Sequence, residues 1–544
     1  MRRATPAAGF AATAAEPSKG WMSGRAGGTE GRTASRSRRV VEGLGANCIK
    51  FAVNAAIRLL ATPFYLARLG RELLGFNSFV RETLNYLQLM QLGLGPSVAA
   101  IVAKELQPGA SEEQRQAVRR KARAGGQAQQ VLALLALLLS VGLSLFVERL
   151  AQGLPRDALF MAKVCTVAFG VELALYLSSG VFSGLLVGRQ LIGQNTLYAS
   201  ASAFLSAAVG VSLVALGWSL YGLAAAAIFS GAFLFLQLRW RALRAGITLD
   251  LLRGPVEWQA MGEVISLSGW MAMATVGALL SFQSSRVILG MIPGMGMSAV
   301  NQFSLLVAVP TLLRGQASQI AVQLRPGLTQ LVHRGADERS KAVARLLLRV
   351  MGMTSAVAFV GTWYLNGPFV TRWVGAEYYA GEKANLLVAT LTAGAIWLFG
   401  FTVLLEVRFQ FQRRGAILLA AGLVTVILSV LLAPTWGIQG VLAAAIAGEL
   451  LVALPFAAAP SLAWLSPGNG MLSTAFSLVS VPCLMLSAAW GLSRLGIPRP
   501  ESWADLVLGG AAIAGGGAVL GTAWLGRDLW RYRPWQRNRP HGAA

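Results

Sequence analysis

Two arginines lie inside the first two hydrophobic stretches of the chain, Arg58 in the first and Arg81 in the second. Since a helix rises about 1.5 Å per residue, both are expected roughly 12–14 Å below the same membrane surface. A charge at the centre of a bilayer costs at least about 2.5–3.5 kcal/mol, so a retained charge faces a cavity or a partner. Two guanidinium groups at one depth suit a diphosphate held between them. The alternative is a structural ion pair, in which Glu82 neutralises one of the arginines.

Two further arginines occupy hydrophobic stretches in the second half of the chain. Arg286 lies near the end of its stretch, where it either joins the anion site or extends to the membrane surface. Arg314 lies deeper, and it offers the second half a cation opposite the pair in the first half. The sequence therefore predicts a cationic cavity to which both halves contribute.

Glu172 and Glu449 are the deepest carboxyl groups, and they have comparable mid-span positions in the two halves. A buried carboxyl resists ionisation, which would let it bind and release a driving proton or sodium ion. The alternative is a neutral group that hydrogen-bonds neighbouring helices. Two histidines and three isolated cysteines form no metal-binding pattern, so no metal or other cofactor is predicted.

Polar side chains cluster on two of the hydrophobic stretches, where a sugar crossing the membrane would need partners. The second stretch carries Asn77, Asn85, Gln88 and Gln91, and a later one carries Asn301 and Gln302. Asn85 and Gln91 are the candidates for contact with a glycan. Four tryptophans, Trp218, Trp363, Trp373 and Trp436, fall near predicted membrane surfaces and fit an aromatic belt.

The elements that must position these residues are about fourteen hydrophobic stretches, each long enough to span a bilayer as a helix. With 55% hydrophobic and 13% charged residues, the chain is predicted to be an all-α integral membrane protein. Two lobes of six helices are expected around a central cavity. The predicted parts are a basic, disordered cytoplasmic tail (1–43), an N-lobe (44–240), a cytoplasmic linker (241–261), a C-lobe (262–458), two further spans (459–526) and a basic tail (527–544).

Basic residues concentrate in every second connection between these stretches, which predicts that both termini are cytoplasmic. The net charge of +24 is spread over many short loops and both tails. That distribution favours contact with anionic lipid headgroups and argues against nucleic acid as a partner.

Four motifs in order give a family resemblance. Leu69, Gly70, Glu72 and Gly75 form a turn after the first stretch, and LGLG follows at residues 92–95. SRVILG stands at residues 285–290, Pro326 follows, and WGIQGVLAAAIAGELL runs over residues 436–451. Together they resemble the polysaccharide-export flippases (O-antigen and exopolysaccharide, Wzx-type) of the multidrug/oligosaccharidyl-lipid/polysaccharide (MOP) superfamily. Gln91 and Ser285 stand where that family usually has aspartate.

The resemblance implies a flippase in the bacterial inner membrane that moves undecaprenyl-diphosphate-linked oligosaccharide, with a polymerase and export machinery as partners. A lipid-linked peptidoglycan precursor presents the same diphosphate and stays open as a substrate. A cation-coupled multidrug exporter of the same superfamily is the other alternative, although carboxylates would be expected to outnumber arginines in its cavity. An enzyme is disfavoured, because the predicted outer connections are short and carry no clustered acids or histidines.

Overall fold

A computed structural model of the chain describes residues 29–87, 111–151, 154–189, 191–244, 258–333, 337–466 and 500–531, with a few single residues between these ranges. Gln91, the side chain of Arg58 and most of the predicted span at 472–493 lie outside the described residues. Within the described ranges the regular structure is entirely helical, as the hydropathy pattern predicts.

The helices follow one another with short connections. They are α1 (Thr29–Leu87), α3 (Glu112–Leu145), α4 (Val147–Leu150), η2 (Arg156–Ala158), α5 (Leu159–Gly188), α6 (Ile192–Ala215), α7 (Ser219–Arg244), α8 (Trp258–Met291), α9 (Gly296–Leu306), α10 (Ala308–His333), α11 (Asp337–Trp373), η3 (Ala376–Tyr378), α12 (Glu382–Val407), α13 (Phe411–Ile446), the π-helical η4 (Ala447–Ala453), α14 (Leu454–Leu465) and α16 (Trp503–Arg531). α1 begins at Thr29, inside the segment that the sequence assigns to a disordered tail.

Nine helical segments of the described residues are long and apolar enough to cross a membrane. A tenth is obtained if α9 and α10, which are bent by 47° at their junction, count as one span. The chain is therefore a multi-pass membrane protein, and the count of fourteen spans stays a prediction.

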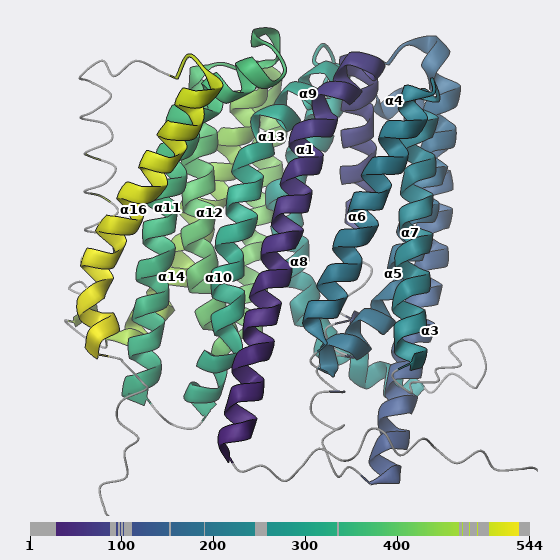
Figure 1. The fold of residues 1–544 in the computed structure, drawn as a ribbon. Coiled ribbons are helices and arrows are strands. Elements are labelled where there is room, and N and C mark those ends of the chain that lie inside the picture. Colours follow the sequence, from purple (N-terminus) through teal and green to yellow (C-terminus); the bar gives the residue numbers. More distant parts are fainter. Residues whose placement is uncertain are drawn as a thin grey trace, which may run out of the picture.

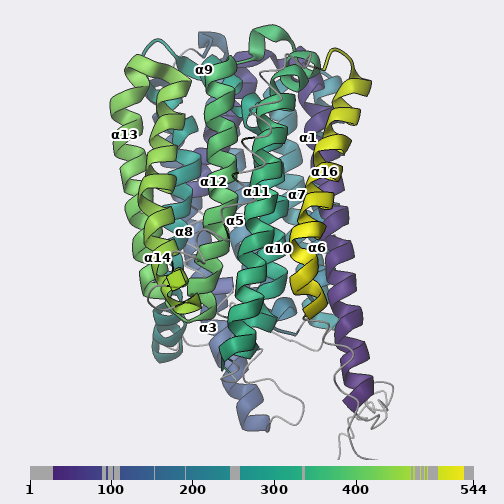
Figure 2. The same ribbon diagram turned by 90° about the vertical axis from the view of Figure 1, so that its left-hand side faces the viewer.

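The helices form two groups that stand side by side along a common axis (Figures 1 and 2). In the N-terminal group α1, α3, α5, α6 and α7 pack together, and in the C-terminal group α8 packs on α13, α10 and α11 on α12, and α16 on α11. α1 crosses to the C-terminal group, where it contacts α8 and α9.

Gly70 turns the chain between the two halves of α1. Its φ of 77° lies in the left-handed region, which a side chain would disfavour, and the two halves run in opposite directions on either side of it. The end of the bundle that holds this turn, at the top of Figure 1, is here called the Gly70 end.

A buried pair of asparagines joins three helices near the bend between α9 and α10. The Asn366 amide donates to the Leu306 carbonyl at 3.0 Å and to Asn385 Oδ1 at 2.9 Å. The Asn385 amide in turn donates to the Trp363 carbonyl at 3.0 Å. Because both side chains are buried, these bonds fix α11 and α12 against the end of α9.

Replacing Asn385 with alanine is expected to lower the free energy of unfolding by about 1–3 kcal/mol, since it leaves buried donors and acceptors without partners. Thermal unfolding of the detergent-solubilised protein measures the loss. Thr390→Ala is the control, because the Thr390 hydroxyl bonds only its own helix, at the Leu386 carbonyl. Equal stability of the two variants would contradict the structural role of Asn385.

Candidate functional site

A cavity of about 520 Å³ lies between the two helix groups, in the half of the bundle toward the Gly70 end. We call it the Arg81 cavity. Its polar lining comes from both groups: Asn77, Ser78, Arg81 and Glu82 of α1, Glu172 of α5, Ser206 of α6, Ser230 of α7, Arg286 of α8, and Asn301 and Ser304 of α9. A site built in this way changes whenever one group moves against the other.

Arg81 is held within the N-terminal group. Its Nη1 lies 3.2 Å from Glu172 Oε2, and its Nε donates to Asn77 Oδ1 at 3.3 Å. The guanidinium also lies over the Phe169 ring, 4.7 Å from the centroid. These bonds use two of the five N–H donors of an arginine, and the side chain keeps 39% of its exposure. Arg81 is therefore fixed in direction and still open to the cavity.

Arg286 makes an ion pair that crosses between the groups. Its Nη1 lies 2.6 Å from Glu82 Oε1, and its Nε donates to Ser304 Oγ at 3.1 Å. The Glu82 carboxylate also accepts from the Asn85 amide at 3.2 Å. With 13% and 18% exposure, the Arg286 and Glu82 side chains are more enclosed than Arg81. The alternative in which Arg286 extends to the membrane surface is wrong, because the cavity holds its side chain.

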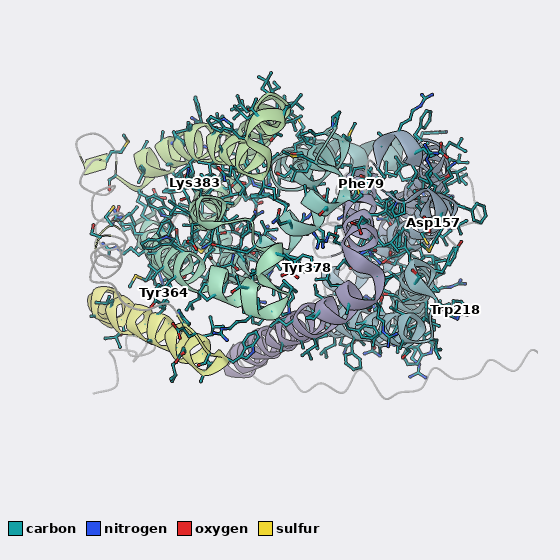
Figure 3. All side chains as sticks on the ribbon, turned by 90° about the horizontal axis from the view of Figure 1, so that it is seen from above. Phe79, Asp157, Trp218, Tyr364, Tyr378 and Lys383 are labelled. Atoms are coloured by element: carbon teal, nitrogen blue, oxygen red, sulfur yellow. The ribbon has the colours of Figure 1, made fainter. Side chains whose placement is uncertain are left out.

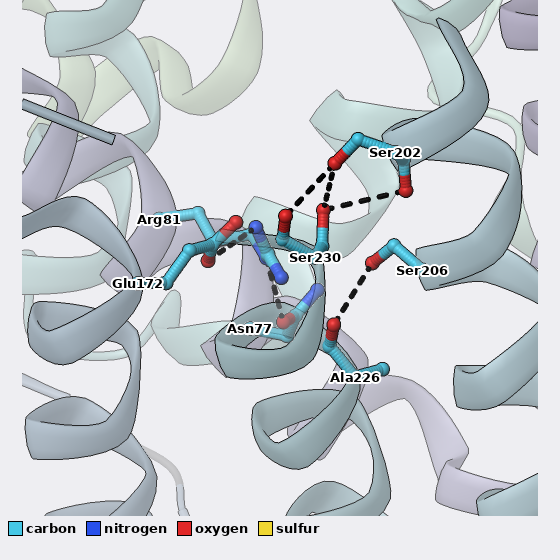
Figure 4. A network of polar contacts seen from close by, with 7 residues as sticks. All are labelled: Asn77, Arg81, Glu172, Ser202, Ser206, Ala226 and Ser230. Carbon is cyan, nitrogen blue, oxygen red and sulfur yellow. Dashed lines mark hydrogen bonds and ion pairs between the residues drawn. The ribbon is translucent and has the colours of Figure 1, made fainter. Parts of the chain in front are cut away.

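Serines of α6 and α7 form a hydroxyl-rich wall beside Arg81 (Figure 4). Ser202 Oγ and Ser230 Oγ lie 2.8 Å apart, and the Ser206 hydroxyl donates to the Ala226 carbonyl at 3.4 Å. The apolar part of this wall consists of alanines at positions 203, 207 and 226 and of Leu223. Small side chains leave room there, and hydroxyl groups can exchange hydrogen bonds with a polar ligand.

The two groups touch tightly between the cavity and the Gly70 end. A Cβ on Gly75 of α1 would overlap the carbonyl oxygen of Met297 in α9, and one on Gly290 would lie 2.6 Å from the Phe79 ring. Phe79 and Met297 are fully buried in the same hydrophobic cluster. Viewed from above, Phe79 lies near the middle of the bundle, between Lys383 and Asp157 of the two groups (Figure 3). The cavity is closed toward the Gly70 end by this contact.

The structure brings together only some of the residues that the sequence proposes. Arg81 and Arg286 share the cavity, while the predicted pair of Arg58 and Arg81 cannot be compared, because the Arg58 side chain lies outside the described residues. Gln91 lies outside them as well. Asn85 supports Glu82 and is not among the lining residues, so it is a positioning residue. Glu82 neutralises Arg286 of the other group, which the sequence did not predict.

Arg314 does not reach the Arg81 cavity. Its guanidinium lies over the ring of Phe282 in α8, 3.0 Å from the centroid, and Arg314 is not among the lining residues. The aromatic face stabilises the buried cation, and the nearby carboxyl group of Glu449 interacts with it electrostatically. The prediction that Arg314 faces the Arg81 pair across one cavity is therefore wrong in this conformation.

The two candidate coupling carboxylates have different surroundings. Glu172 lines the Arg81 cavity and is 26% exposed, whereas Glu449 is buried to 1% within the C-terminal group. Among the described residues, neither carboxyl oxygen of Glu449 has a hydrogen-bond partner. Glu449 belongs to the π-helical turn η4, and such turns are frequent at functional sites. Glu449 is thus a buried acid whose charged neighbour is Arg314, and its role in ion coupling stays a prediction.

Several functional residues escaped the sequence analysis. Ser206 of α6, Ser230 of α7 and Ser304 of α9 line the cavity and were not singled out. Ser304 is three residues from Asn301, so these two lie on one face of α9. That spacing was the available signal. Trp373 was assigned to the aromatic belt, but it lines the cavity, is 9% exposed and donates to the Leu59 carbonyl at 2.7 Å. The belt assignment of Trp373 is wrong.

Comparison with known proteins gives weak sequence similarity and clear structural similarity. No protein-family model matches the chain. The uncharacterized membrane protein EpsK of Bacillus subtilis (strain 168) is 22% identical over 345 residues, which is 61% of this chain and 65% of EpsK. The chain thus spans less than two thirds of the length of this curated relative.

The solved structures cover far more of the chain. The lipid II flippase MurJ in its inward closed conformation has a TM-score of 0.63 at 12% identity, over 91% of this chain and 99% of MurJ. The eukaryotic MATE transporter AtDTX14 has a TM-score of 0.59 at 14% identity, over 82% of this chain and 99% of its own. A MOP superfamily transporter from Pyrococcus furiosus has a TM-score of 0.54 at 16% identity, over 79% and 96% of the two chains.

The chain has the MurJ and MATE fold. At these identities the likeness concerns the path of the chain and not the ligand. The class of ligand is therefore inferred from the charged side chains of the Arg81 cavity.

Proposed function

We propose that this protein is a flippase for polyprenyl-diphosphate-linked oligosaccharides that serve cell-surface polysaccharide synthesis. The distribution of basic residues supports an orientation with the Gly70 end on the outer side of the bacterial inner membrane. The fold supports a transporter, and the substrate class follows from the cavity. The observation that carries the proposal is the pair of arginines, Arg81 and Arg286, which reach one cavity from opposite helix groups.

A diphosphate is the ligand that this arrangement suits best. Arginine binds phosphate oxygens with two parallel N–H bonds, and each of the two guanidinium groups keeps donors that its present partners do not use. An arriving diphosphate can replace Glu172 at Arg81 and Glu82 at Arg286. The glutamates thus hold the arginines in position until the anion binds.

Replacement of Glu82 links substrate binding to movement. The Glu82–Arg286 pair is one of the contacts that join the two groups, beside the Gly75–Met297 and Phe79–Gly290 contacts. When the diphosphate takes over Arg286, the closed side loses that ion pair, and the groups can separate toward the Gly70 end. The sugars then leave through the opened passage while the polyprenyl tail stays in lipid.

A cation-coupled drug exporter of the same fold is the second candidate. It is supported by the two acids in the cavity, because carboxylates compensate a cationic drug. Both of those acids, Glu82 and Glu172, are already paired with arginines in the described part of the chain. A cation would have to displace guanidinium groups, whereas an anion can also use the N–H donors that Arg81 and Arg286 keep beside these pairs, so an anionic substrate is favoured.

Purified protein in proteoliposomes tests the proposal. A fluorescent polyprenyl-diphosphate oligosaccharide is expected to become accessible to a membrane-impermeant quencher only when the protein is present, and a monophosphate-linked sugar is expected to move far more slowly. Ethidium export without movement of the diphosphate lipid would show a drug exporter. Comparison of an exopolysaccharide repeat unit with lipid II separates the two diphosphate-linked substrates.

Glu449→Gln is expected to leave the protein folded and to remove the dependence of transport on an imposed proton or sodium gradient. The amide has the shape of the neutral carboxyl but cannot bind a proton or neutralise a cation. Transport rates with and without each gradient measure the effect. Glu406→Gln is the control. The Glu406 carboxylate lies at the end of the bundle opposite the Gly70 end, in ion pairs with Arg325 and Arg414 at 2.7 and 3.1 Å. Unchanged gradient dependence in Glu449→Gln would exclude this residue as the coupling site.

The proposed setting includes further partners. The polysaccharide-export resemblance implies a polymerase that consumes the delivered repeat units and an export system behind it. Loss of surface polysaccharide on deletion of the gene, with accumulation of lipid-linked repeat units at the inner leaflet, is the cellular result that supports this setting.

A further inference from the structure

A second pocket opens at the Gly70 end of the C-terminal group. Its volume is about 460 Å³, and it lies between α9, the loop around η3 and the turn within α13. We call it the Trp436 pocket. It is lined by Gly294, Met295, Ser298, Ala299, Gln302, Tyr379, Ala380, Trp436, Ile438 and Gln439.

The chemistry of this pocket differs from that of the Arg81 cavity. None of the described residues that line the Trp436 pocket carries a charge, so it offers no opposite charge to a phosphate. It offers an indole ring that is 60% exposed, the carboxamides of Gln302 and Gln439, and the hydroxyl of Ser298. Carboxamides both donate and accept hydrogen bonds, as sugar hydroxyls do, and an aromatic face packs against the C–H face of a sugar ring.

α9 separates the two spaces. Asn301 and Ser304 of this helix line the Arg81 cavity, whereas Ser298 and Gln302 line the Trp436 pocket. The helix has 11 residues and begins at Gly296, which like Gly294 has a positive φ, and it is bent by 47° against α10. It also carries Met297, which closes the cavity against Gly75. A shift of α9 that opens this closure therefore changes the walls of both the cavity and the pocket.

We propose that the Trp436 pocket is a carbohydrate subsite on the outer face, which binds the sugars of the lipid-linked oligosaccharide as they pass α9. This assignment rests on the proposed function for the source of the sugar. It replaces the aromatic-belt interpretation of Trp436, because the indole lines a pocket together with the side chains of Gln302 and Gln439.

The first test measures sugar binding without lipid or phosphate. Saturation-transfer NMR on the full-length protein in detergent uses a soluble N-acetylglucosamine trisaccharide as the probe. Transfer to the sugar protons is expected in the wild type and is expected to be lost in Trp436→Ala and reduced in Gln439→Ala. Trp218→Ala is the matched control, since Trp218 is 54% exposed at the Gly70 end of the other helix group. Absence of transfer in the wild type, or equal transfer in all variants, overturns the proposal.

The second test separates this proposal from the flippase assignment. Trp436→Ala is expected to slow transport of polyprenyl-diphosphate trisaccharide about 3- to 10-fold, the range that one aromatic contact contributes, and to leave transport of the sugar-free polyprenyl diphosphate unchanged. Equal slowing of both lipids overturns the carbohydrate subsite while the flippase assignment stands. A wild-type protein that moves neither lipid overturns the flippase assignment, and the binding test then decides the subsite alone.

Discussion

Arg286→Ala is expected to reduce transport of a polyprenyl-diphosphate oligosaccharide to the background rate, and Arg81→Ala is expected to do nearly the same. Each substitution removes a charge-assisted contact to the diphosphate, worth about 1.5–3 kcal/mol, which corresponds to about 10- to 150-fold weaker binding. Arg286→Ala has a second consequence, because it leaves Glu82 without its partner in a side chain that is only 18% exposed.

Binding and transport should be measured separately for these variants. Competition by inorganic pyrophosphate against the fluorescent lipid reports the anion site, and the quencher assay reports movement. Arg156→Ala is the control, since Arg156 is exposed at the Gly70 end outside the cavity. Arg81→Lys is expected to bind more tightly than Arg81→Ala but more weakly than the wild type, because an ammonium cannot form two parallel bonds to a phosphate. Normal transport in both alanine variants would refute the anion site.

Gly75→Ala is expected to prevent closure at the Gly70 end and so to stop the transport cycle. The added methyl group would occupy the place of the Met297 carbonyl, and backbone cannot move aside as a flexible side chain can. Overpacking of this kind costs about 1–3 kcal/mol, which lowers the closed population about 5- to 150-fold. Because transport needs both conformations, the loss of one is enough to block it.

Accessibility of a single cysteine measures this closure. In a background without the native cysteines, Asn77→Cys places a thiol in the Arg81 cavity, where the closed wild-type structure shields it from an impermeant maleimide added outside. Combination with Gly75→Ala is expected to expose the thiol. Gly361→Ala is the matched control, because nothing lies within 4 Å of a Cβ at that helical glycine. Equal labelling with and without Gly75→Ala would show that the two groups do not close at this contact.

The sequence was sufficient to predict the fold class and to predict that two arginines, Arg81 and Arg286, face a cavity. Within a bilayer, the backbone N–H and C=O groups of a long apolar stretch find their hydrogen-bond partners by forming a helix. An all-α membrane protein therefore followed directly from the hydropathy pattern. The price of a charge in a bilayer drew attention to Arg81 and Arg286 for a physical reason that does not depend on the fold. The same rule also selected Arg314, which an aromatic ring accommodates instead.

The partners of these charges could not be predicted, because they depend on how each helix is rotated about its axis. Glu172 is 91 residues from Arg81, and Glu82 is 204 residues from Arg286, so neither pair has a local signal. The sequence offered Glu82 only as an alternative partner for Arg58 or Arg81, because these residues lie in neighbouring predicted helices. The Trp436 pocket was hidden for the same reason, since three distant segments build it.

The pairing of two arginines with two glutamates in the Arg81 cavity bears on the energy source of transport. An empty carrier whose site has no excess charge reorients without doing work against the membrane potential. A carrier loaded with a diphosphate moves a negative charge on each phosphate, and an interior-negative voltage contributes about 2.3 kcal/mol per charge per 100 mV to outward movement. The membrane voltage would therefore drive the outward step of the loaded carrier and would not oppose the return of the empty carrier. This gives the transport cycle a direction without a coupling ion.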